Sequence, residues 1–180
     1  AYKTNYEIPL GNKQKFSNPR ISYTANGKWL LTIGMECETQ ASTLTDKPMG
    51  IDLGIKELAV VSYDGECIVF GNKNKSRQVR QLHRKLNHYQ RSLARKYRAN
   101  GSYAETGGVR RDNEKIKRLH YRISNIRKNY IHQATHALVS MLPKRVVMED
   151  LNVQCMMKNR HLARAIQEQG FHEFIRQMRY

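Results

Sequence analysis

Hydrophobic and polar positions alternate with two different periods along the chain, which predicts strands in its first part and long helices after them. The segment Asn18–Glu38 has two alternating apolar runs around Asn26-Gly27, a dipeptide suited to a type I′ turn, and this predicts a β-hairpin. Three further strands should follow one another, at Gly50–Leu53, Glu57–Ser62 and Glu66–Phe70. The part of the chain from Asn18 to Phe70 is therefore expected to be mainly β-structure.

After these strands the apolar residues recur every three or four positions, which is the spacing of one helix face. One such stripe runs from Val79 to Tyr97, and a second runs from Ile116 to Met141. A glycine-rich loop is expected between them, at Asn100–Val109. Two helices of this length should pack as an antiparallel hairpin, with their apolar stripes together and their Lys and Arg residues outside.

The end of the chain returns to a strand and then a helix. Pro143 should end the second long helix, and Arg145–Glu149 is a short apolar run that predicts a strand. The segment Asn159–Tyr180 predicts one amphipathic helix, weakened in its middle by Gly170. Three strands, helices, a fourth strand and a helix suit an α/β fold of the RNase H-like class, present as an incomplete copy.

The most informative feature of the composition is charge. The chain has 32 Lys and Arg but only 15 Asp and Glu, which gives a formal net charge of +17. Such an excess favours a polyanionic partner, with nucleic acid first and an anionic membrane surface second. No apolar run approaches the length of a membrane span, and Ala1–Leu10 does not resemble a secretory signal. The three widely spaced cysteines exclude a disulfide framework or a CxxC zinc pair, so the reduced cytoplasm is the expected compartment.

The positive charge is concentrated in one segment, since residues 73–128 hold 18 Lys and Arg against three acidic residues. Charged helices usually mix the two signs, whereas 72–98 has ten basic residues and no acid, which favours contact with nucleic acid over a merely solvated face. Contacts with phosphates would be sensitive to salt and carry little sequence information. The candidate nucleic-acid-binding residues are Arg77, Arg80, Arg84, Lys85, Arg91, Arg95, Arg118 and Arg122.

Two carboxylates are the candidates for chemistry. Asp52 lies in the first strand of the triplet, within GIDLG, and Glu149 ends the fourth strand, within VVMED. In an RNase H-like sheet these strands are neighbours, so the two carboxylates could face each other at one edge. Hydrolysis of a phosphodiester uses hard oxygen ligands that hold one or two Mg²⁺ ions. Gly50 and Gly54 bracket the first carboxylate and would let a phosphate backbone approach.

Simpler interpretations of these residues stay open. An Asp before Gly is often only a turn former, and a Glu-Asp pair after a strand often caps a helix. Asp64 is better explained as a hairpin-turn residue, and Asp150 as a cap. His132 and His136 are spaced as two metal ligands on one helix face, but a third ligand is not evident, so packing or solvent exposure is the favoured interpretation.

Two runs carry a resemblance to a known family. The sequence MGIDLGIKELAVVS, together with VVMEDLNVQCMMKNRHLARAIQEQGFHEFIRQMRY, resembles TnpB, the insertion-sequence protein related to the type V CRISPR effectors, whose nuclease domain is RuvC-like. The resemblance implies that residues 1–46 are the C-terminal part of a wedge-like β domain. It also implies that 47–180 is an incomplete RuvC-like domain into which a basic helical hairpin, 73–142, is inserted.

The same resemblance implies a function and a set of ligands. Asp52 and Glu149 match the acidic residues of the first and second RuvC motifs, and would be catalytic ligands of Mg²⁺ or Mn²⁺. The third motif, with a further Asp, and the family's four-cysteine zinc ribbon lie beyond this chain, so we expect weak cleavage or none from it alone. Cys155 stands where the family usually has Gly, and Phe171 where it has Trp. The implied partners are a guide RNA and target DNA, in a prokaryotic, nucleoid-associated protein.

Two other functions remain open from the sequence. One is a nuclease-inactive, RNA-guided DNA-binding protein of the same family, although such descendants usually lose the RuvC carboxylates that are kept here. The other is a conventional DDE-type transposase with an RNase H-like core, which would lack a long basic insertion between the first and fourth strands.

Overall fold

The computed structural model of the chain describes residues 15–24, 27–36, 42–99 and 106–179. The chain divides into two compact units, Ala1–Ala41 and Ser42–Tyr180, so the division falls a little before the boundary expected after residue 46. Thr45 belongs to the second unit because its backbone N–H and its hydroxyl donate to the carbonyl oxygen of Leu142, at 2.7 and 2.9 Å.

The described part of the first unit is a two-stranded antiparallel ribbon of β1 (Phe16–Tyr23) and β2 (Trp29–Met35), as the alternation predicted. The expected two-residue turn is wrong, since Thr24 N–H donates to Lys28 O and three residues lie between them. Gly27, the last of the three, has a left-handed φ of 83°; Asn26 lies outside the described residues. This closure fits a longer loop that ends in a left-handed glycine.

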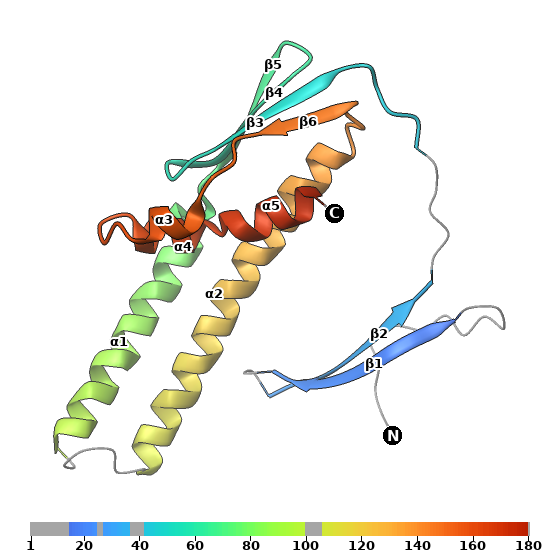
Figure 1. The fold of residues 1–180 in the computed structure, drawn as a ribbon. Coiled ribbons are helices and arrows are strands. Elements are labelled where there is room, and N and C mark those ends of the chain that lie inside the picture. The colour runs from blue at the N-terminus through green and yellow to red at the C-terminus, as the bar shows by residue number, and fades with distance from the viewer. Residues whose placement is uncertain (1–14, 25–26, 37–41, 100–105, 180) are drawn as a thin grey trace. The chain divides into compact units, whose positions relative to one another are not determined.

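The second unit contains a four-stranded sheet in the order β5-β4-β3-β6 (Figure 1). The strands β3 and β4, and β4 and β5, pair antiparallel, whereas β3 and β6 pair parallel. All four strands were predicted from the sequence, and so was the adjacency of the first and the last. Their bounds are Pro48–Leu53 for β3, Glu57–Tyr63 for β4, Glu66–Gly71 for β5 and Arg145–Met148 for β6.

Two long helices lie between β5 and β6 in the chain and run side by side as an antiparallel hairpin (Figure 1). A short 3-10 turn, η1 (Lys73–Lys75), leads into α1 (Arg77–Ala99), and α2 spans Gly107–Val139. The helix α2 begins earlier than expected, because the Thr106 hydroxyl caps it by accepting from Val109 N–H at 3.4 Å. Within the described residues no helix is both long enough and apolar enough to cross a membrane.

The helix α2 belongs to two apolar cores. Its first half packs on α1, where Val79, Leu82, Leu86 and Ile123 form one buried cluster. Its second half supplies Ile131, Ala134 and Leu138 to a larger cluster beneath the sheet. The stripe predicted for this helix therefore changes direction along it, since its two halves face different partners.

The last part of the chain corrects one prediction. In place of one helix over 159–180, the structure has α4 (Ala163–Gln169) and α5 (Phe171–Arg179), preceded by a short helix α3 (Val153–Met157). The break between α4 and α5 falls at Gly170, whose φ of 72° is left-handed and ends α4. The turn lets Ile166, Phe171 and Phe174 all enter the core beneath the sheet.

The tip half of the hairpin contains a buried ion pair. Asp112 is 5% exposed, and Lys96 donates to its carboxylate at 2.6 Å and to Gly108 O at 3.1 Å. The hydrogen bond from Lys96 holds the pKa of the Asp112 carboxyl below its usual value. Asp112 is one of only three acids in the basic segment. Because it is buried between the two helices, it does not reduce the positive charge of their outer faces.

We predict that Gly170→Ala lowers the free energy of unfolding by about 2 kcal/mol, against about 1 kcal/mol for Gly65→Ala. Both glycines have a left-handed φ, but an added Cβ would meet Ile131 Cδ1 at 3.0 Å at Gly170 and no atom within 4 Å at Gly65. Urea denaturation of the two variants measures the difference. Equal losses of unfolding free energy in the two variants would mean that the side chain of Ile131 moves aside without an energetic cost.

Candidate functional site

Asp52 and Glu149 occupy neighbouring positions on two paired strands. The parallel register of β3 and β6 pairs Ile51 with Met148, and each carboxylate follows this pair by one residue. Ile51 and Met148 face the apolar core, so strand alternation places Asp52 on the opposite face of the sheet. Both Asp52 and Glu149 are exposed. The structure thus brings the two predicted carboxylates to one edge of the sheet, on a surface open to a ligand.

The chemistry of this pair fits a hard cation in part. Two adjacent carboxylates match Mg²⁺, which keeps several waters and often takes only one or two protein carboxylates together with substrate phosphates. An added Cβ at Gly50 would meet no atom within 4 Å, so the backbone beside Asp52 is open to close approach. The described residues hold no cluster of three or more His, Cys, Asp or Glu side chains that could bind a metal. Asp52 and Glu149 are therefore a candidate pair of ligands, and not a complete cage among the described residues.

The other acidic and histidine candidates lie in separate local environments. Asp64 has a left-handed φ of 53° in the turn before β5 and pairs with Lys47, as expected of a turn residue. Asp150 does not cap α3, because Asn152 does so by accepting from Cys155 N–H at 3.0 Å. His132 lies 3.4 Å from the amide of Gln177, whereas His136 lies 3.3 Å from the Ser140 hydroxyl, so the two rings have different neighbours.

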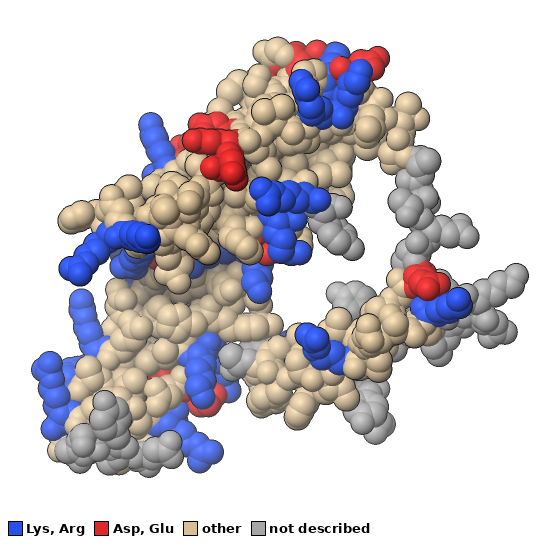
Figure 2. Space-filling view, viewed as in Figure 1, with Lys and Arg blue, Asp and Glu red and all other residues tan. Residues whose placement is uncertain are grey.

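The basic residues of α1 form a continuous exposed track. Two open grooves follow this helix and meet at Arg84, and from Arg77 to Arg98 they extend about 30 Å. Figure 2 shows Lys and Arg side chains along the outer edge of the hairpin. The residues that line the grooves are Arg77, Arg80, Gln81, Arg84, Asn87, His88, Arg91, Ala94, Arg95 and Arg98.

The remaining predicted basic residues are exposed but lie outside these grooves. They are Lys85 on α1 and Arg118 and Arg122 on α2. None of the eight predicted residues forms an ion pair with an acid among the residues that the structure describes. Their charge is therefore not neutralised by the described part of the chain. Arg98 was missed, although its spacing of three residues from Arg95 continues the same helix face.

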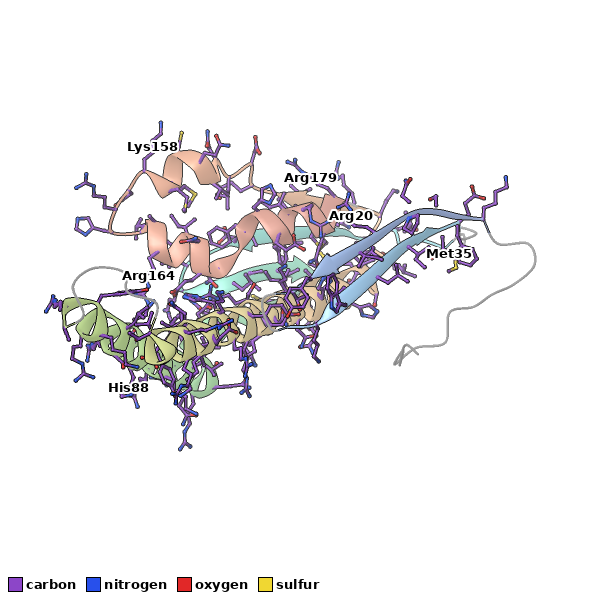
Figure 3. All side chains as sticks on the ribbon, turned by 90° about the horizontal axis from the view of Figure 1, so that it is seen from below. Arg20, Met35, His88, Lys158, Arg164 and Arg179 are labelled. Atoms are coloured by element: carbon purple, nitrogen blue, oxygen red, sulfur yellow. The ribbon has the colours of Figure 1, made fainter. Side chains whose placement is uncertain are left out.

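His88 and Tyr89, the aromatic side chains near the arginine track, differ in whether a ligand could reach their rings. His88 lines the groove and projects from α1 in Figure 3. Tyr89 is half-buried, and the Lys115 ammonium lies 4.8 Å from the centre of its ring. A cation over the ring occupies the face that a nucleobase would need. Of these two residues, only His88 is placed to touch a ligand in the groove.

A polar cluster at the base of the hairpin was not predicted. One oxygen of Glu168 in α4 lies 3.0 Å from Arg164 Nε, 3.6 Å from Arg127 Nη2 and 4.0 Å from His83 Nε2. The last two nitrogens are buried and have no hydrogen-bond partner among the described residues. Burial lowers the pKa of His83 and of Arg127. These residues come from α1, α2 and α4, so a sequence pattern within one helix could not reveal them.

The family follows from comparison with known proteins. The family model OrfB_IS605, described as a probable transposase, matches residues 32–160. A candidate RNA-guided DNA endonuclease, InsQ of Escherichia coli (strain K12), is 32% identical over 170 residues. The chain belongs to the OrfB_IS605 family. This confirms the resemblance to TnpB that was drawn from the two motifs.

Two further matches describe the extent of the similarity. A second candidate RNA-guided DNA endonuclease, from Streptomyces pristinaespiralis, is 32% identical over 172 residues. These matches cover 86% and 96% of the chain but only 39% and 40% of InsQ and of the Streptomyces protein, respectively. The chain thus spans about two fifths of the length of these relatives. A cryo-EM structure of a CRISPR-Cas12f ternary complex aligns with 89% of the chain and 33% of its own, at 16% identity and a TM-score of 0.42, which is too low to establish a shared fold.

We predict that the double variant Arg91→Gln and Arg95→Gln weakens binding to an RNA duplex and lowers the slope of log affinity against log salt by about 2. Both arginines line the α1 groove and lack an acidic partner among the described residues. The matched control, Lys158→Gln with Arg160→Gln, removes the same charge from two exposed residues after α3 that also lack an acidic partner among the described residues. Fluorescence anisotropy of a labelled RNA duplex across a salt series measures the affinity and the salt slope of each double variant. Equal slopes for the two double variants would show that only net charge matters.

We predict that the chain loses stability as the pH falls below about 6.5. Because burial lowers the pKa of His83 from 6.5, the unfolded chain binds more protons than the folded chain near pH 6. Thermal unfolding between pH 7.5 and 5 should show this loss, and His83→Gln should reduce it. His136→Gln, which removes an exposed histidine, is the control. An undiminished loss in His83→Gln would contradict the assignment.

Proposed function

We propose that the chain is the part of a transposon-encoded, RNA-guided DNA endonuclease that supplies two carboxylate ligands and a nucleic-acid-binding hairpin. The observation that carries the proposal is the parallel register of β3 and β6, which gives Asp52 and Glu149 adjacent positions on an open edge of the sheet. The strand order, with the first strand between the second and the fourth, supports an RNase H-like, RuvC-like nuclease core. The names of InsQ and of the Streptomyces protein support RNA-guided DNA cleavage.

The two carboxylates would hold Mg²⁺ or Mn²⁺ and present it to a DNA phosphate. When bound, such a metal lowers the pKa of a water nucleophile and stabilises the leaving oxygen of the phosphodiester. Asp52 lies on a strand whose other face is buried, so its backbone is fixed by the core beneath it. Glu149 directly follows β6, and its position is set by the pairing of Met148 with Ile51. The chain's own contribution is thus to hold two anionic oxygens side by side.

The hairpin would bind the guide RNA or the RNA–DNA duplex through phosphates. Its arginine track follows a single helix, exposes guanidinium groups over about 30 Å and has one exposed His beside it. Contacts of this kind recognise the shape of an A-form duplex and not its bases. Because Asp52 and Glu149 are both present, cleavage is favoured over a role as a binding protein without nuclease activity.

We predict that Asp52→Asn and Glu149→Gln each reduce DNA cleavage by roughly a thousandfold, because each removes an anionic ligand from a metal that contributes several kcal/mol. Both residues are exposed, so folding and guide RNA binding should persist. Cleavage of a labelled target by the protein as its gene encodes it, assembled with its guide RNA, is the measurement. Asp64→Asn is the control, since Asn tolerates the left-handed turn at that position. Normal cleavage by either ligand variant would refute the metal assignment.

A further inference from the structure

The loop after Asp52 is held by a side chain from a distant helix. The strand β3 ends at Leu53, and the chain turns through Gly54, Ile55 and Lys56 into β4. Gln169 Nε2 donates to the carbonyl oxygens of Gly54 and Ile55, each at 3.0 Å, and lies 3.4 Å from that of Glu57. A single amide therefore bridges the two ends of this loop, beginning two residues beyond the candidate metal ligand.

Gln169 is placed for this role by its own burial. It is 4% exposed and is the last residue of α4, directly before the left-handed Gly170 that ends the helix. A buried amide normally has its donors satisfied, because an unpaired polar group costs about 1–3 kcal/mol. The donors of Gln169 are directed at the β3–β4 loop, so their loss would leave carbonyl groups of that loop without these hydrogen bonds.

The same loop is tied to the base of the hairpin. Asn72 Nδ2 donates to Ile55 O at 2.9 Å, and Lys75 Nζ donates to Lys56 O at 3.2 Å. The neighbouring Asn74 donates to Glu168 O at 2.8 Å and accepts from Arg127 Nε of α2 at 2.6 Å. Asn74 N–H also donates to Asn72 Oδ1 at 2.9 Å. The loop after Asp52, the η1 turn that leads into α1, the middle of α2 and the end of α4 thus share one network of hydrogen bonds.

We propose that Gln169 is a positioning residue: it fixes the β3–β4 loop, and through it the end of β3 that carries Asp52, against the base of the nucleic-acid-binding hairpin. This inference rests on the proposed function, because it assigns Gln169 to the placement of a metal ligand. Gln169 acts through Asp52 and does not itself touch the metal or the DNA. Asn72 supports the same loop with a single hydrogen bond and should contribute less.

The test is Gln169→Leu, which keeps the approximate volume of the side chain and removes its donors. Gln177→Leu is the matched control: Gln177 accepts from Thr135 at 2.8 Å and donates to Glu173 at 2.7 Å, but it joins α5 to α2 and makes no hydrogen bond to the loop. We expect Gln169→Leu to slow single-turnover cleavage at least tenfold and to raise the Mg²⁺ concentration for half-maximal rate several-fold. Affinity for the guide RNA should change less than twofold. Gln177→Leu should leave all three quantities within twofold.

A measurement without metal or substrate separates positioning from general weakening of the fold. Amide hydrogen exchange of the peptide that covers residues 50–58 should accelerate in Gln169→Leu and remain unchanged in Gln177→Leu. If Gln169→Leu does not fold, Asn72→Ala takes its place, since it removes one hydrogen bond from the partly exposed edge of the loop. It should then give smaller changes in the same direction.

The outcomes distinguish this inference from the function on which it rests. If Asp52→Asn abolishes cleavage while Gln169→Leu matches Gln177→Leu in rate, Mg²⁺ requirement and exchange, the positioning role is wrong and the proposed function stands. If Asp52→Asn cleaves normally, both fail. If Gln169→Leu loses cleavage only in proportion to its loss of thermal stability, with no change in Mg²⁺ requirement, Gln169 is structural and the inference is overturned.

Discussion

The parallel pairing of β3 with β6 is the constraint on which the rest of the second unit depends. Parallel neighbours cannot be joined by a tight turn, so the chain must cross over between them, and here the crossover contains β4, β5 and the whole helical hairpin. The short edge strand β6 is held by its pairing with β3, by the packing of Met148 on the core and by the bond from Lys144 N–H to Lys47 O at 3.0 Å. One pairing therefore sets the positions of both candidate ligands.

The crossover also explains how a strongly cationic segment remains folded. The helix α2 spans two cores, so it anchors the hairpin beneath the sheet while its first half packs against α1. Two buried or half-buried acids pair with bases of the hairpin, Asp112 with Lys96 and Glu168 of α4 with Arg127. The outer arginines of α1 keep their mutual repulsion, which a bound polyanion would relieve.

Much of the fold could be predicted because local pattern and global structure agree. Strand alternation, the turn at Asp64-Gly65 and the helical stripes located the sheet and the hairpin, and the order of the strands placed Asp52 beside Glu149. The failures lie where contacts between distant segments decide. The break at Gly170 lets Ile166, Phe171 and Phe174 pack in one cluster with Ile131 of α2. The early start of α2 is a local exception, since Thr106 caps the helix three residues before Val109. The Glu168 cluster and the hydrogen bonds of Gln169 join segments about a hundred residues apart. A periodic pattern within one helix or strand cannot predict such contacts.

The central claim, that Asp52 and Glu149 bind one metal together, is tested most directly by Mn²⁺ binding in a complex with nucleic acid, followed by electron paramagnetic resonance. The account predicts that Asp52→Asn and Glu149→Gln each lose as much Mn²⁺ affinity as the double variant, because two ligands of one ion act as a unit. Losses that simply add, or single variants that bind Mn²⁺ as the unchanged protein does, would contradict a shared site.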